Sequence, residues 1–235
     1  MMNARTWLVA AFGIMAAAAP AQTPGAPASP LDPSAPVAPA PEGGSPVANP
    51  TVGPLEAAGM ADVPLGSRQH MEDGFFEIRV GNAENAIRAF EWGLEIAPDH
   101  PRLLFGLGTA LVTAKRHAQA LEVFQRALKA RPADHLILNN MAWVYATTPD
   151  PRLRNGAKAL EFARRALLIA PEDHHVWSTM AEAYFVSGNF ERAERCSREA
   201  VRIAQNAGVS PERLDEYRRQ SDRCAAAALA MTILD

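Results

Sequence analysis

The residues with the most evident capacity for chemistry are histidines that lie beside aspartates. Three Asp–His pairs recur along the chain, and one more histidine follows the last of them: Asp99 with His100, Asp134 with His135, and Asp173 with His174 and His175. Imidazole is the commonest metal ligand in proteins, and carboxylates also bind metal ions. A ladder of these side chains is therefore a candidate metal site.

The spacing of the pairs argues against one shared ion. If each pair marks the junction between stacked helical units, equivalent positions lie about 10 Å apart, which is one layer of packed helices. The ligands of a metal ion lie only about 2 Å from it. We therefore predict polar residues at helix starts, with no metal and no other cofactor. An enzyme that uses these histidines with a metal stays the alternative, and a tightly bound ion would favour it.

Other catalytic and nucleic-acid-binding patterns are missing from the sequence. It has no glycine loop for phosphate, no zinc spacing of cysteine and histidine, and no serine in a glycine elbow. The formal net charge is −3, and acidic and basic residues are interspersed without a basic stripe. We predict no catalytic residues and no nucleic-acid partner.

A fixed period organises the residues that must position these side chains. Glycine, alanine, phenylalanine and proline return after 34 positions: Gly74 and Gly108, Ala86 and Ala120, Phe90 and Phe124, and Pro98 and Pro132. Met141 and Met180 are instead 39 apart, so five extra residues lie in the segment 147–155. A period of this length is typical of stacked helical hairpins, which bury their apolar faces only against one another.

Small side chains and prolines indicate how such hairpins are built. Gly74 and Gly108, with Ala142 and Ala181 in the later copies, let the two helices of a hairpin approach closely. Prolines end the second helices, because proline disfavours helical conformation in the residue before it. We expect the next first helices to be capped by an aspartate in each case: Asp99, Asp134 and Asp173.

On these residues the chain resembles tetratricopeptide repeat proteins. The resemblance implies an all-α fold, a right-handed superhelical array of four helix-turn-helix repeats in a domain spanning 66–207. The repeats cover 67–100, 101–134, 135–173 and 174–207. A capping helix is expected within 208–235, where Ser210 and Pro211 form a helix start.

The first part of the chain has a different composition. Residues 1–21 combine Arg5, a short apolar run and small residues before Gln22, which predicts a signal peptide for export to the periplasm or beyond. An uncleaved anchor is the alternative. Residues 22–65 are rich in proline and alanine and predict a disordered linker, with a proline-rich ligand for a partner domain as the other interpretation.

The resemblance also implies a partner-binding groove lined by the first helix of each repeat. Its positions are aromatic, apolar and polar in this chain: Arg68, Met71, Phe75, Arg102, Phe105, Thr109, Asn139, Trp143, Ser178, Glu182 and Phe185. Aromatic anchors commonly supply binding energy at interfaces. The alternative for Phe75, Phe105 and Trp143 is that they pack between neighbouring first helices or under the proline-rich linker.

The two cysteines lie near the end of the chain. An antiparallel hairpin that turns near Gly208 places Cys196 within one helical turn of Cys224. In an oxidising compartment this predicts a disulfide, and two buried free thiols are the alternative.

These patterns together predict an exported, non-catalytic scaffold of bacterial type. It would bind a protein or peptide partner in the groove of the array. The alternative is an obligate subunit of an envelope complex that docks through its outer face.

Overall fold

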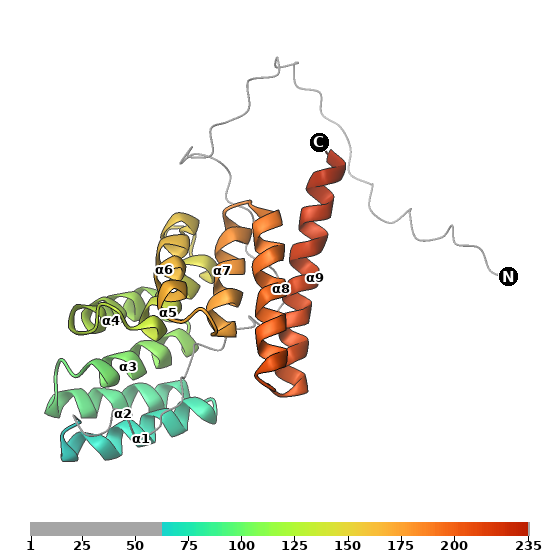
Figure 1. Ribbon diagram of the computed structural model, residues 1–235. Helices are drawn as coiled ribbons and strands as arrows, with labels where there is room; N and C mark the ends of the chain where they lie inside the picture. Colours follow the sequence, from blue (N-terminus) through green and yellow to red (C-terminus); the bar gives the residue numbers. More distant parts are fainter. Residues whose placement is uncertain (1–62, 235) are drawn as a thin grey trace, which may run out of the picture. The chain divides into compact units, whose positions relative to one another are not determined.

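The computed structural model describes residues 63–234, and all regular secondary structure in this range is helical (Figure 1). The helices in chain order are α1 (Leu65–Arg79), α2 (Ala83–Ile96), α3 (Pro101–Thr113), α4 (His117–Ala130), α5 (His135–Thr147), α6 (Gly156–Ile169), α7 (His174–Val186), α8 (Phe190–Asn206) and α9 (Pro211–Leu234). The predicted signal peptide and nearly all of the predicted linker lie outside the described residues.

The helices pack as consecutive hairpins. α1 packs on α2, α3 on α4, α5 on α6 and α7 on α8. Each first helix also contacts both helices of the preceding hairpin, as α3 contacts α1 and α2, and α7 contacts α5 and α6. This arrangement buries the apolar face that a single hairpin would leave in water, and it confirms the predicted all-α repeat array.

Two fully buried phenylalanine rings fill the space between the first hairpins. Phe90 lies against Gly74 of its own hairpin and Gly106 of the next, and Phe124 lies against Gly108. A methyl group on Gly106 would lie 2.2 Å from Phe90 Cε1, and one on Gly108 would lie 2.4 Å from Phe124 Cε1. The rings therefore require hydrogen as the side chain at these positions, and the 34-residue period alone did not reveal Gly106.

The turn between the two helices of a hairpin follows one pattern in three repeats. The second residue after the first helix has a positive φ: 84° at Gly81, 59° at Lys115 and 74° at Gly188. Its N–H bonds a carbonyl three residues back, and the next N–H bonds one five residues back, as from Asn82 to Glu77. These bonds satisfy the last carbonyls of the helix. Lys115 adopts the conformation that glycine adopts in the other two turns.

The helix starts confirm two predicted caps and correct the third. The Asp134 carboxylate accepts hydrogen bonds from Leu136 N and Ile137 N, and that of Asp173 accepts one from His175 N. Asp99 does not cap α3, since His100 is the residue before that helix and Pro101 begins it. The reason is spacing: Asp134 and Asp173 stand two residues after the closing proline, whereas Asp99 stands one after Pro98 and pairs with Arg126 at 3.2 Å.

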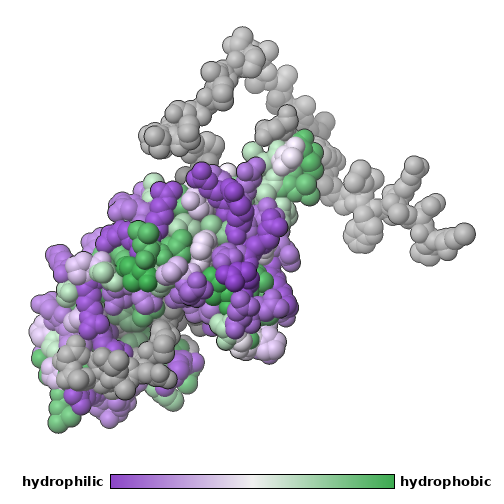
Figure 2. Space-filling view, in the orientation of Figure 1, coloured by the Kyte–Doolittle hydropathy of each residue, from purple (hydrophilic) through white to green (hydrophobic). Residues whose placement is uncertain are grey.

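α9 takes the place that the first helix of a fifth repeat would have. It packs on α8 and contacts α7, as α3 does with α2 and α1. Tyr217 and Cys224 are fully buried against the last hairpin. The helix continues past this contact, and Leu229, Met231 and Ile233 are exposed near its end, where Figure 2 shows hydrophobic surface.

The structure does not form the disulfide predicted between Cys196 and Cys224. Both residues are free and buried, and burial raises the pKa of each thiol to about 11. Cys196 belongs to α8 and Cys224 to α9, and these two helices pack on each other. The pairing stays a prediction for the oxidised protein.

No helix among residues 63–234 combines the length and apolar character that crossing a membrane requires. This includes α9, the longest of them, whose first half carries many charges.

We predict that Gly106→Ala lowers the free energy of unfolding by about 1–3 kcal/mol, because the added methyl group overlaps the buried Phe90 ring. Urea denaturation followed by circular dichroism measures the change. Gly66→Ala is the matched control, since its methyl group would meet nothing closer than 3.5 Å. Equal stability of the two variants would contradict the role of the ring.

We also predict that Lys115→Gly raises the free energy of unfolding by about 0.5–1 kcal/mol, since glycine adopts a positive φ without the steric cost that a side chain brings. The same urea titration applies. Lys129→Gly serves as the control, because it places glycine inside α4 and should cost about 1 kcal/mol. Destabilisation by both substitutions would show that the turn at Lys115 carries no strain.

Candidate functional site

The predicted groove residues lie on the first helices α1, α3, α5 and α7, and most are buried. Seven of the eleven are buried with exposed fractions of 4% or less: Met71, Phe75, Thr109, Asn139, Trp143, Ser178 and Glu182. The other four are partly exposed: Arg68, Arg102, Phe105 and Phe185. In this packing only these four offer surface to a partner, and their role in binding stays a prediction.

Aromatic contacts explain the burial at the first two repeats. The Phe75 ring meets the Phe90 ring edge-on at 4.9 Å between centroids. Phe105 lies 6.5 Å from Phe75 and 6.4 Å from Phe124, so it joins neighbouring hairpins and keeps part of its ring exposed. Phe75 and Phe105 thus face each other between the first helices α1 and α3, which is the alternative that the sequence left open.

At the fourth repeat the capping helix covers the predicted groove residues. Gln220 of α9 donates from Nε2 to the Ser178 carbonyl at 3.0 Å and to Glu182 at 2.7 Å, and its Oε1 accepts from the Ser178 hydroxyl at 2.8 Å. Arg223 bonds the Glu182 carboxylate, and its guanidinium lies 4.4 Å from the centre of the Phe185 ring.

Sequence reasoning missed Gln220 and Arg223, although both stand on the side of α9 that carries Tyr217 and Cys224. A buried amide needs hydrogen-bond partners, and these are the polar groups of α7. The last repeat therefore uses its groove-lining polar groups to hold the chain's own final helix.

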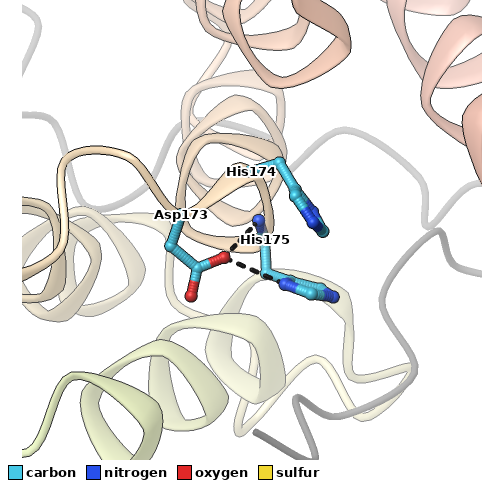
Figure 3. Close-up of side chains that lie close together, drawn as sticks. All are labelled: Asp173, His174 and His175. Atoms are coloured by element: carbon cyan, nitrogen blue, oxygen red, sulfur yellow. Dashed lines mark hydrogen bonds and ion pairs between the residues drawn. The ribbon is translucent and has the colours of Figure 1, made fainter. Parts of the chain in front are cut away.

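A second cluster of functional side chains lies where α7 begins. Asp173 Oδ1 accepts from His175 N at 2.8 Å and lies 2.9 Å from His175 Nδ1 (Figure 3). His174 Nδ1 lies 2.8 Å from the Tyr217 hydroxyl of α9, and the two histidine rings are 4.1 Å apart. The other carboxylate oxygen of Asp173 is 3.9 Å from Nε2 of His135, at the start of α5.

The surroundings of this cluster change its protonation. Burial, followed by the charge of His175, lowers the pKa of His174 to about 4, so that its imidazole is neutral at pH 7. Burial alone would raise the pKa of Asp173, but the hydrogen bond and charge of His175 outweigh it and hold that pKa below its usual value. At neutral pH the cluster therefore offers the Asp173 carboxylate and the neutral imidazole of His174.

Side chains from two neighbouring junctions approach each other more closely than the expected spacing of the junctions suggested. Metal-ligating atoms of Asp173, His174 and His175 lie within 4.8 Å of one another, and His135 reaches the same carboxylate from the preceding junction. Three of these residues come from one junction, and the side chains close the gap that separates the helix axes. Among the described residues these three form the group that could hold a metal ion.

Apolar side chains are also exposed on second helices, which form the other surface of the array. Trp92 and Ile96 of α2 are 52% and 50% exposed, and Leu168 and Ile169 of α6 are 86% and 44% exposed. Burying such side chains against a partner would be favourable.

Comparison with known proteins agrees with this architecture. Residues 77–135 match the family model of the tetratricopeptide repeat. None of the curated proteins compared with the chain matches it.

Solved structures of low sequence identity share the fold. MamA 41-end from Desulfovibrio magneticus RS-1 superposes with a TM-score of 0.53 at 17% identity, covering 73% of this chain and 96% of that one. TTC0263, a thermophilic TPR protein from Thermus thermophilus, gives a TM-score of 0.53 at 18% identity and covers 69% of this chain and 99% of that one. With its helical hairpins, its 34-residue period and these matches, the chain has the fold of tetratricopeptide repeat proteins, and residues 77–135 match the model of that family.

Proposed function

We propose that this tetratricopeptide repeat protein is an exported, non-catalytic scaffold that binds a protein or peptide partner along its first helices. Such repeat proteins generally serve as scaffolds for protein–protein interaction and not as catalysts. The observation that carries the proposal is the row of partly exposed side chains Arg68, Arg102 and Phe105 on α1 and α3.

The chemistry of this row indicates the kind of segment it suits. Arg68 and Arg102 are one period apart, and Arg102 and Phe105 are three residues apart, so that they share a face of α3. Guanidinium groups bind carboxylates with paired hydrogen bonds, and a partly exposed ring offers an apolar anchor. The row therefore fits an extended segment that carries acidic and apolar side chains.

A second candidate rests on the exposed apolar residues of the second helices. An obligate subunit of an envelope complex would bury Trp92 and Ile96, or Leu168 and Ile169, against a permanent partner. Their exposure of 44–86% favours this candidate, because burying large apolar side chains against a partner is favourable.

Site-specific photocrosslinking in the native cells distinguishes the two surfaces. A photoreactive phenylalanine derivative replaces Phe105, Leu168 or, as a polar exposed control, Gln125. We expect discrete crosslinked species from position 105 and none from position 125. Arg102→Glu should weaken the crosslink from position 105 about tenfold, since a hydrogen bond to a charged group contributes about 1.5–3 kcal/mol.

The remaining outcomes decide against the groove. Crosslinks from position 168 alone would support docking through the outer face. Crosslinks from position 105 that are unchanged by Arg102→Glu would show that Arg102 does not contribute to binding. No discrete species from either position would contradict both candidates.

Export is the other part of the proposal, and residues 1–21 support it by their composition. We expect the mature chain to begin at Gln22, because Ala19 and Ala21 are the small residues that a signal peptidase requires. Intact mass and cell fractionation of the protein made in its native cells measure this. A cytoplasmic chain that retains residues 1–21 would contradict export, and an exported chain that retains them would indicate an anchor.

A further inference from the structure

We propose that Asp173, His174 and His175, joined by His135, bind one divalent metal ion of the zinc type. One ligand atom from each of the first three residues lies within 4.8 Å of the others. The Asp173 carboxylate lies 3.9 Å from His135 Nε2. Three imidazoles and one carboxylate are a donor set that suits zinc and related transition-metal ions.

The side chains are close to the separation that such an ion requires. Tetrahedral ligands about 2.0–2.1 Å from zinc lie about 3.3 Å from one another. The 3.9 Å between His135 and Asp173 is only slightly longer, and the atoms 4.8 Å apart must close by about 1.5 Å. All four residues are partly exposed, so rotation about their side-chain bonds can supply this adjustment.

Hydrogen bonds already hold the two adjacent rings by their Nδ1 atoms. His175 Nδ1 lies 2.9 Å from Asp173 Oδ1, and His174 Nδ1 lies 2.8 Å from the Tyr217 hydroxyl. When Nδ1 carries the proton and donates it to an oxygen, Nε2 keeps its lone pair for a metal. This leaves Nε2 of His174 for the ion. At His175 the ion takes the place of the proton between Nδ1 and Asp173 Oδ1, because a carboxylate that holds Nδ1–H cannot also reach an ion on Nε2 of the same ring. Asp173 Oδ2 lies toward His135 Nε2. Tyr217 acts as a positioning residue for His174.

The charges around the site select among cations. Asp173 is its one carboxylate, whereas calcium and magnesium require several oxygen ligands. The amino end of α7 and the nearby Arg213 both oppose a cation, and Glu216 lies 3.5 Å from Arg213 and offsets part of that charge. An ion that bonds strongly to imidazole nitrogen is therefore favoured over one held by charge alone.

Binding would connect three successive elements of the array. His135 begins α5, His174 and His175 begin α7, and Tyr217 belongs to α9. One ion would therefore fix the junction of the third and fourth repeats and, through Tyr217, the capping helix. Because the ion binds the folded chain, it should raise the melting temperature.

The experiment uses the whole protein, purified without a histidine tag and stripped with EDTA. Zinc chloride is titrated by calorimetry, and cobalt(II) is added in parallel because its visible absorption reports tetrahedral coordination. We expect one zinc per chain, a higher melting temperature with zinc, and no response to calcium. His174→Ala and His175→Ala should each abolish this binding, whereas the control His70→Ala on α1 should leave it unchanged.

Tyr217→Phe tests the positioning of His174 with little change in packing. The variant keeps the buried ring and loses only the hydroxyl, so we expect zinc affinity to fall by about 10–100-fold. Circular dichroism confirms that each variant is folded. His135→Ala tests whether His135 binds the ion as its fourth ligand.

Two results would overturn the proposal. The first is the absence of saturable zinc binding to the unaltered chain. The second is equal affinity in the folded His174→Ala and His175→Ala variants, which would assign the binding to adventitious surface histidines. Neither result depends on partner binding, so a failure here leaves the proposed scaffold role untouched.

Discussion

Close contact between helices at positions without a side chain is the constraint on which this array depends. Phe90 and Phe124 are fully buried, and each ring lies directly on glycine backbone, Phe90 on Gly74 and Gly106 and Phe124 on Gly108. The rings set the distance between helices of one hairpin and between one hairpin and the next. Because each unit is stable only through such contacts, the repeats hold one another in place, as in other solenoids.

The same close packing limits the surface that remains for function. Trp143 and Thr109 of the first helices are buried within the array. Ser178 and Glu182 are buried under α9 and form hydrogen bonds with its Gln220. Polar groups that a partner would otherwise meet are thus already satisfied within the chain. The surfaces that remain for the proposed functions are the partly exposed arginines and phenylalanines, the exposed apolar side chains of second helices, and the junction where α7 begins.

Much of this fold follows from the sequence, because a 34-residue period and its five-residue slip are visible without coordinates. The period predicts hairpins, the caps at Asp134 and Asp173, and a final helix after Ser210. The period does not distinguish the side chains of a first helix that face solvent from those that face the next helix, because apolar residues occur at both kinds of position. Nor does the period show that the His135 side chain reaches Asp173, because this contact depends on side-chain conformation across a junction. It also does not show that His100, and not Asp99, is the residue directly before α3.

The capping helix has a consequence for how such a gene can change. α9 occupies the place of a further first helix, and its Gln220 and Arg223 match polar groups that belong to α7 of this last repeat. Duplication of a unit immediately upstream of α9 would have to reproduce those groups, or the new last unit would leave the buried amide unsatisfied. Duplication nearer α1 avoids this demand, although a new neighbour of α2 must still place glycine against the buried Phe90 ring, as Gly106 does. The last repeat and its capping helix must therefore be inherited together.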